Sequence, residues 1–95
     1  MFVGAYRIEL FFPAAQSLKE KRSILNRTKT RLAQLGLAVA EVDGQDLWQR
    51  STLGVAAVSA DAAYLDDLPD TIARVVERDG RASLLRVERE VRPAF

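Results

Sequence analysis

The stretch FVGAYRIELFFPAAQSLKEKRSIL, residues 2–25, decides the fold of this chain of 95 residues. Within residues 2–12 every even position is apolar, aromatic or glycine, whereas the charged side chains of Arg7 and Glu9 fall on odd positions. A period of two predicts a strand with its even side toward a core. Pro13 follows and ends the strand, because proline cannot donate to a sheet ladder.

A helix is predicted to begin directly after this strand. Ser17 stands three residues before Glu20, the spacing of a capping box in which the two side chains satisfy free backbone N–H groups. Gly36 stands where a left-handed C-terminal cap is wanted, so the helix should run for about 18 residues. One apolar stripe at helical spacing comprises Leu18, Ile24, Leu25, Thr28, Leu32 and Leu35.

The rest of the chain predicts three more strands and one helix. Residues 37–42 and 52–59 are short apolar segments and predict two strands of a hairpin joined by residues 43–51. Residues 82–92 predict a last strand. In that strand the pattern places Leu85, Val87 and Val91 on one side and Arg86, Glu88 and Glu90 on the other.

Between the hairpin and the last strand lies a second amphipathic segment. Ser59 or Asp61 can cap a helix that continues to Asp79. Pro69 interrupts it, because a proline there lacks the N–H that would bond the carbonyl of Leu65. The sequence therefore predicts a kink, or a new helical start, at Pro69.

The order strand, helix, strand, strand, helix, strand predicts one α+β domain over residues 1–95 with the ferredoxin-like βαββαβ sandwich fold. Its four-stranded antiparallel sheet has both helices on one face and the second and fourth strands outermost. A second copy or a partner could cover the open face, or water could. The residues expected on that face are Val3, Ala5, Arg7, Glu9, Phe11, Leu84, Arg86, Glu88 and Glu90.

The composition of the chain excludes several kinds of functional site. The chain has no cysteine and no histidine, which excludes disulfides, thiol nucleophiles and the usual zinc sites. No phosphate loop or nucleophile elbow is present, and Glu41 with Asp43, expected on one strand face, is the only close carboxylate pair. These features predict a protein that is not an enzyme and has no cofactor or metal. The start lacks a signal peptide and no segment could span a bilayer, so we expect a cytoplasmic protein without membrane contact.

Although the net charge is only +1, the first helix is strongly basic. Residues 16–35 carry six cations against one acid, while residues 60–79 are acidic. Two interpretations stay open: an anion or RNA site, or charge that is solvated or neutralised by the second helix. Lys21 projects into the apolar stripe and should reach water or a carboxylate, with Asp43 or Asp46 as candidates. The candidate RNA-binding residues are Lys19, Lys21, Arg22, Arg27, Lys29 and Arg31.

The predicted hairpin connection holds the only tryptophan of the chain. An aromatic side chain beside an arginine in a loop is typical of a recognition anchor. The simpler interpretation is that Leu47 and Trp48 fold back and plug one end of the core. The candidate partner-binding residues are Gln45, Asp46, Trp48, Gln49 and Arg50.

Three segments, FVGAYRIEL (2–10), AQSLKEKRSIL (15–25) and AEVDGQDLWQRSTLGVAAVS (40–59), resemble the YlxP-like family of small bacterial proteins of unknown function. The resemblance implies a ferredoxin-like fold. It also implies a link to translation, because genes of such proteins commonly lie among those for initiation and small-subunit maturation factors. A histidine is common in the family where this chain has Gly44, and no catalytic residue can be carried over. The family's recurring positions correspond to Ser17, Leu18, Lys19, Lys21, Arg22, Glu41, Val42, Gln45, Asp46, Trp48, Gln49 and Arg50.

Three functions follow as hypotheses. The first is an adaptor that contacts ribosomal RNA or a ribosome-associated factor through the basic helix and the Trp48 loop. The second is a homodimeric interaction module that uses the open sheet face or an edge strand. The third is a regulatory domain that binds a small molecule near the hairpin.

Overall fold

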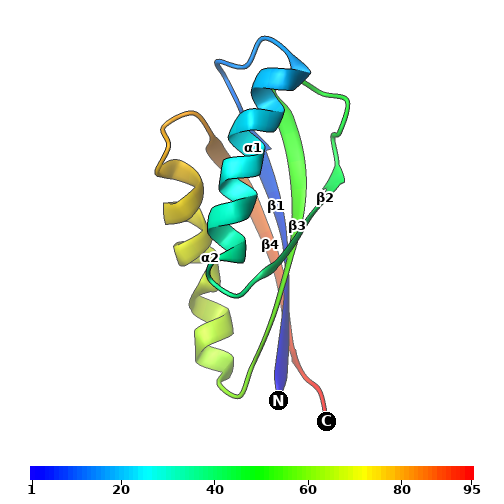
Figure 1. Ribbon diagram of the computed structural model, residues 1–95. Helices are drawn as coiled ribbons and strands as arrows, with labels where there is room; N and C mark the ends of the chain where they lie inside the picture. The colour runs from blue at the N-terminus through cyan, green and yellow to red at the C-terminus, as the bar shows by residue number, and fades with distance from the viewer.

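The computed structural model describes all residues 1–95 and has the predicted ferredoxin-like topology. Its sheet has the strand order β2-β3-β1-β4 with antiparallel pairing throughout, and both helices cover one face (Figure 1). No helix is long and apolar enough to cross a membrane. The elements are β1 (Phe2–Phe11), α1 (Leu18–Ala33), β2 (Ala38–Asp43), β3 (Arg50–Ser59), α2 (Ala62–Glu77) and β4 (Ser83–Pro93).

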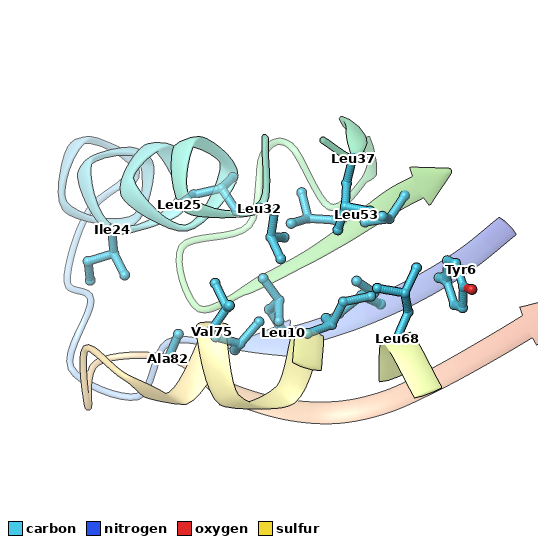
Figure 2. Close-up of a cluster of buried hydrophobic side chains, with 14 of the residues drawn as sticks. Tyr6, Leu10, Ile24, Leu25, Leu32, Leu37, Leu53, Leu68, Val75 and Ala82 are labelled. Atoms are coloured by element: carbon cyan, nitrogen blue, oxygen red, sulfur yellow. The ribbon is translucent and has the colours of Figure 1, made fainter. Parts of the chain in front are cut away.

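One hydrophobic core lies between the sheet and the two helices. The even positions of β1 face it, as the alternation predicts, and Ile8 is fully buried. Leu53 and Val55 of β3 stand opposite Ile8 and Tyr6, so the two central strands supply the floor of the core. Figure 2 shows buried side chains of both helices directed into this core. They include Ile24, Leu25, Leu32, Leu65, Leu68, Ile72, Val75 and Val76.

The capping prediction for α1 is confirmed at its start. The Ser17 hydroxyl accepts a hydrogen bond from Glu20 N at 3.1 Å, while the Glu20 carboxylate accepts from Gln16 N at 2.9 Å. At the other end of α1, the apolar stripe expected from the sequence includes one residue, Leu35, that lies beyond the helix. Gln34 is the C-cap and Gly36 has φ +82°, so the chain has already turned at Leu35, which is 43% exposed.

Helix α2 is capped by Asp61, whose carboxylate accepts from Ala63 N at 2.9 Å. It runs as one helix through Pro69, so the predicted second start is wrong. The reason is visible in the core. The hydroxyl of Tyr6 donates a hydrogen bond to the carbonyl of Leu65, the group that Pro69 deprives of its helical partner. A strand side chain thus replaces the missing helical hydrogen bond.

Strand β4 contains a bulge that the alternation did not reveal. Glu9 stands opposite Arg86 but Leu10 stands opposite Leu84, so one extra residue, Leu85, is inserted between them. Because successive side chains of a strand point to opposite faces, one inserted residue exchanges the two faces for all residues of β4 that precede it. Leu84 therefore packs against the core and Leu85 is 48% exposed, which corrects the predicted positions of both.

Candidate functional site

Lys21, which lies in α1, has the most unusual environment in the chain, because its charged side chain is completely buried. Its ammonium donates to the carbonyl oxygens of Gly44 at 2.7 Å and Arg50 at 3.1 Å. It also lies 3.5 Å from the Gln45 carbonyl oxygen and 3.4 Å from Glu41 Oε2. A buried ammonium needs such partners, since an unpaired one would be strongly destabilised. Lys21 therefore ties the first turns of α1 to both ends of the β2–β3 connection.

The carboxylate that pairs with Lys21 is Glu41, not Asp43 or Asp46 as the sequence suggested. A register shift between Glu41 and Asp43 puts Asp43 opposite Thr52 on the open side of the sheet, while Glu41 turns toward α1. The two acids therefore do not share one strand face, and the expected carboxylate pair is wrong. Glu41 Oε2 also accepts from the Ser51 hydroxyl, so it is engaged in holding the hairpin.

The loop from Gly44 to Gln49 is fixed by further contacts. Gly44 has φ +79°, and a Cβ there would lie 3.2 Å from the Cα of Ser51, so the turn requires glycine. The Gln49 side-chain amide donates to the carbonyl oxygens of Pro13 at 3.1 Å and Ala15 at 3.3 Å. Gln49 thus joins the loop to the β1–α1 connection, a role that no local pattern in the sequence indicates.

Trp48 does not plug the core. Its side chain is 56% exposed and that of Leu47 is 53% exposed, so the expected fold-back is wrong. Gln45, Asp46 and Arg50 are also exposed. The backbone around them is held by Lys21 and Gln49, which leaves the large side chains presented to solvent from a restrained loop.

The basic residues of α1 divide into two groups. Arg27 donates through Nε and Nη2 to Asp79 Oδ2 at 3.1 and 2.9 Å, and Arg31 Nη1 lies 4.0 Å from the same oxygen. Asp79 directly follows the C-cap of α2, so the turn after the second helix, rather than the helix itself, supplies the acid that pairs with these two cations. For Arg27 and Arg31 the interpretation as neutralised charge fits the geometry.

Lys19, Arg22 and Lys29 form no ion pair. Lys19 and Arg22 are exposed in the first turns of α1, and Lys29 is half-buried about two turns after Arg22. The first turns of α1 lie at the same end of the molecule as the β2–β3 connection (Figure 1). The fold therefore gathers two free cations and the exposed Trp48 at one end, and places Arg27 and Arg31 nearer the other.

Comparison with known proteins finds a matching family and a solved structure with a similar fold. The profile of a family described as "Protein of unknown function (DUF503)" matches residues 3–89. Uncharacterized protein YlxP of Bacillus subtilis (strain 168) is 34% identical over 88 residues, covering 80% of this chain and 95% of YlxP. A de novo designed protein with ferredoxin fold, solved by NMR, is similar with a TM-score of 0.58 and 13% identity, over 99% of this chain and 88% of the designed one. That last likeness concerns the fold alone.

Proposed function

Because this chain belongs to the DUF503 family of YlxP-like proteins of unknown function, we propose its function from its own surface: a non-catalytic adaptor that binds RNA at the ribosome. One observation carries the proposal. Lys19 and Arg22 have no carboxylate partner, and they lie at the end of the molecule where Trp48 is exposed on a restrained loop. Cations and an exposed aromatic ring at one end of a molecule match the chemistry of a nucleic-acid strand.

The two kinds of side chain would contact different parts of RNA. Lys19 and Arg22 would bind phosphates, which release counterions and supply affinity without reading sequence. Trp48 would stack on a base, which requires a base that is not already stacked in a helix. The proposed ligand is therefore a single-stranded or looped segment of ribosomal RNA.

The carboxylate pair that the sequence offered for catalysis is separated in the structure. Glu41 accepts hydrogen bonds from Lys21 and Ser51, and Asp43, on the open side of the sheet, accepts one from Gly44 N at 2.8 Å. General acid–base catalysis by a pair needs both groups within reach of one substrate. The separation of Glu41 from Asp43 supports a binding role over a catalytic one.

The double variant Lys19→Glu/Arg22→Glu is expected to stop co-sedimenting with purified small ribosomal subunits at low salt. Both positions are exposed helix sites, so the melting temperature should change little. The parent's affinity should fall steeply with salt, with a log–log slope of roughly −0.7 for each phosphate contacted. If the double variant sediments with the subunits to the same extent as the parent, the proposal is wrong.

The matched control is Arg74→Glu/Arg78→Glu, which makes the same charge change on exposed positions of α2 and its C-cap. This control should sediment like the parent. If both double variants lose binding equally, net charge alone governs sedimentation and the α1 site is disproved. Treating the subunits with RNase before the assay should abolish the parent's binding, and persistence would indicate a protein partner instead.

Trp48→Ala is expected to weaken RNA binding without altering the fold. A stacked base contributes about 1–3 kcal/mol by alanine substitution, which corresponds to a roughly 5- to 150-fold loss of affinity. The ring is more than half exposed, so its removal should change the melting temperature by little. Titration of a fluorescent single-stranded RNA measures the loss, and Leu47→Ala, at a neighbouring exposed side chain, is the control. Unchanged affinity of Trp48→Ala would contradict the stacking role.

A further inference from the structure

The face of the sheet opposite the helices has a hollow over its β2–β3 half. In the pairing register Ala38, Ala56 and Ala5 form one row across three strands, and Ala40 and Gly54 form part of the next row. Small side chains in adjacent rows leave the sheet backbone close to the surface. The hollow has a volume of about 720 Å³, and it is open to solvent rather than enclosed.

Larger apolar side chains border this hollow along the strands. Val42 of β2 is 54% exposed at one end and Val58 of β3 is 64% exposed at the other. On the remaining side stand Arg7 of β1 and Glu88 of β4, which are directly opposite each other in the register. An exposed apolar surface with a charged border is typical of a protein interaction site.

The charges on this face argue against nucleic acid as its occupant. Four cations and four acids are present, and two ion pairs form among them, Arg86–Glu88 (3.6 Å) and Arg92–Glu90 (2.5 Å). A face of zero net charge does not attract phosphates, and its one aromatic ring, Phe11, is half-buried. The same neutrality means that two copies of the face do not repel each other. The eight charged residues are Arg7, Glu9, Asp43, Arg50, Arg86, Glu88, Glu90 and Arg92.

The area of the face is sufficient for a dimer of modest affinity. The four strands have 10, 6, 10 and 11 residues. At about 16 Å² of sheet per residue, from the usual strand spacing and rise, they present roughly 600 Å² per copy. Two copies would bury about 1,200 Å² in total, which is the lower end of the range for specific interfaces.

We propose that a second copy of this chain packs on the open sheet face, so that the two apolar hollows lie within a face-to-face interface of two sheets. Such an arrangement leaves α1 and α2 of each copy on the outside, since the helices lie on the other face of the sheet. Lys19 and Arg22 belong to α1 and Trp48 to the β2–β3 connection, outside the four strands, so the dimer would present the adaptor's proposed RNA site twice.

Sedimentation equilibrium of the full chain tests the interface. From about 5 to about 500 μM the parent is expected to shift from the chain mass of 10.6 kDa toward twice that mass. Ala56→Arg, at an exposed position in the middle of the hollow, should weaken dimerisation by about tenfold or more. Ala33→Arg, the same substitution on an exposed position of α1, should dimerise like the parent.

Each outcome of this experiment has a definite meaning. A parent that stays at the monomer mass throughout the range overturns the proposal, and so does a dimer that Ala56→Arg leaves intact. If Ala56→Arg lowers the melting temperature strongly, Val58→Lys replaces it, because that side chain is already 64% exposed. Loss of the dimer in Val58→Lys at an unchanged melting temperature supports the interface, and an intact dimer rejects it.

Discussion

Lys21→Met is expected to lower the free energy of unfolding by about 3–5 kcal/mol, the usual cost of removing one partner of a buried ion pair. Methionine fills the same apolar channel but cannot donate to the carbonyl oxygens of Gly44 and Arg50, and it leaves the Glu41 carboxylate, which is only 19% exposed, without a cation. At about 4–8 °C per kcal/mol for a domain of this size, the melting temperature should fall by more than about 10 °C. Thermal and urea unfolding measure the change.

Lys19→Met is the control, because it removes the same type of side chain two residues away at an exposed position. Its effect on unfolding should stay within about 0.5 kcal/mol. The network also predicts a local effect. In Lys21→Met the backbone amides of residues 44–50 should exchange hydrogen faster than those of α2, because the anchor of this loop is gone. Equal stability of the two variants would show that Lys21 is not the anchor of the β2–β3 connection.

Tyr6→Phe should cost about 1–3 kcal/mol, although it deletes only one oxygen atom. The carbonyl of Leu65 has no helical donor because Pro69 lacks an N–H, so the Tyr6 hydroxyl is its hydrogen-bond partner. Removal of the hydroxyl leaves a buried acceptor unsatisfied, and the cost of that exceeds the net value of an ordinary hydrogen bond. Chemical unfolding of Tyr6→Phe against the parent gives the difference.

A double-mutant cycle with Pro69→Ala isolates this mechanism. Alanine restores the N–H that can bond the Leu65 carbonyl, so Tyr6→Phe should cost markedly less in the Pro69→Ala background than in the parent. If Tyr6→Phe lowers the free energy of unfolding equally in both backgrounds, the Tyr6 hydroxyl does not replace the N–H that Pro69 lacks. Tyr64→Phe, at a tyrosine that is 45% exposed, serves as the control and should be nearly neutral.

The same hydroxyl gives a pH dependence. Burial, followed by the nearby charge of Asp66, raises the pKa of Tyr6 above its usual value of 10.0. A folded-state pKa above the unfolded one means that the stabilisation is complete below about pH 10 and is lost as the pH rises through the folded-state pKa. Between pH 9 and about pH 11 the parent should therefore lose more stability than Tyr6→Phe.

Several features of the fold were predictable because they depend on neighbouring residues only. The alternation of β1 identifies its buried face, and the Ser17–Glu20 spacing identifies the start of α1. The left-handed turn at Gly36 was predicted from position alone. Each signal lies within a single element or turn, and the local backbone preference agrees with the tertiary fold there.

The errors have a common cause. Leu84 and Leu85 exchange sides because of a bulge against β1, and Glu41 and Asp43 separate because of a register shift against β3. A bulge is fixed by the fit between two strands, and the alternation of one strand carries no mark of it. For Trp48 the sequence left open an exposed anchor or a plug of the core, and the exposed side chain on a loop held by other residues rules out the plug.

The candidate sites show the same division. Sequence alone identified the basic helix and the tryptophan loop, but it could not separate Lys19 and Arg22, which remain unpaired, from Arg27 and Arg31, which face Asp79 just after α2. The hollow on the sheet face was missed because its alanines and glycine come from three strands and carry no chemistry of their own.

By itself the sequence determined the order of the elements, the buried face of β1, the start of α1 and the absence of histidine and cysteine chemistry. Only the tertiary structure decided which charges are free, which carboxylate meets Lys21 and whether Trp48 is buried. Periodicity and capping are properties of a few adjacent residues, whereas ion pairs, bulges and exposure depend on residues that lie far apart in the chain and meet only when the sheet and helices pack.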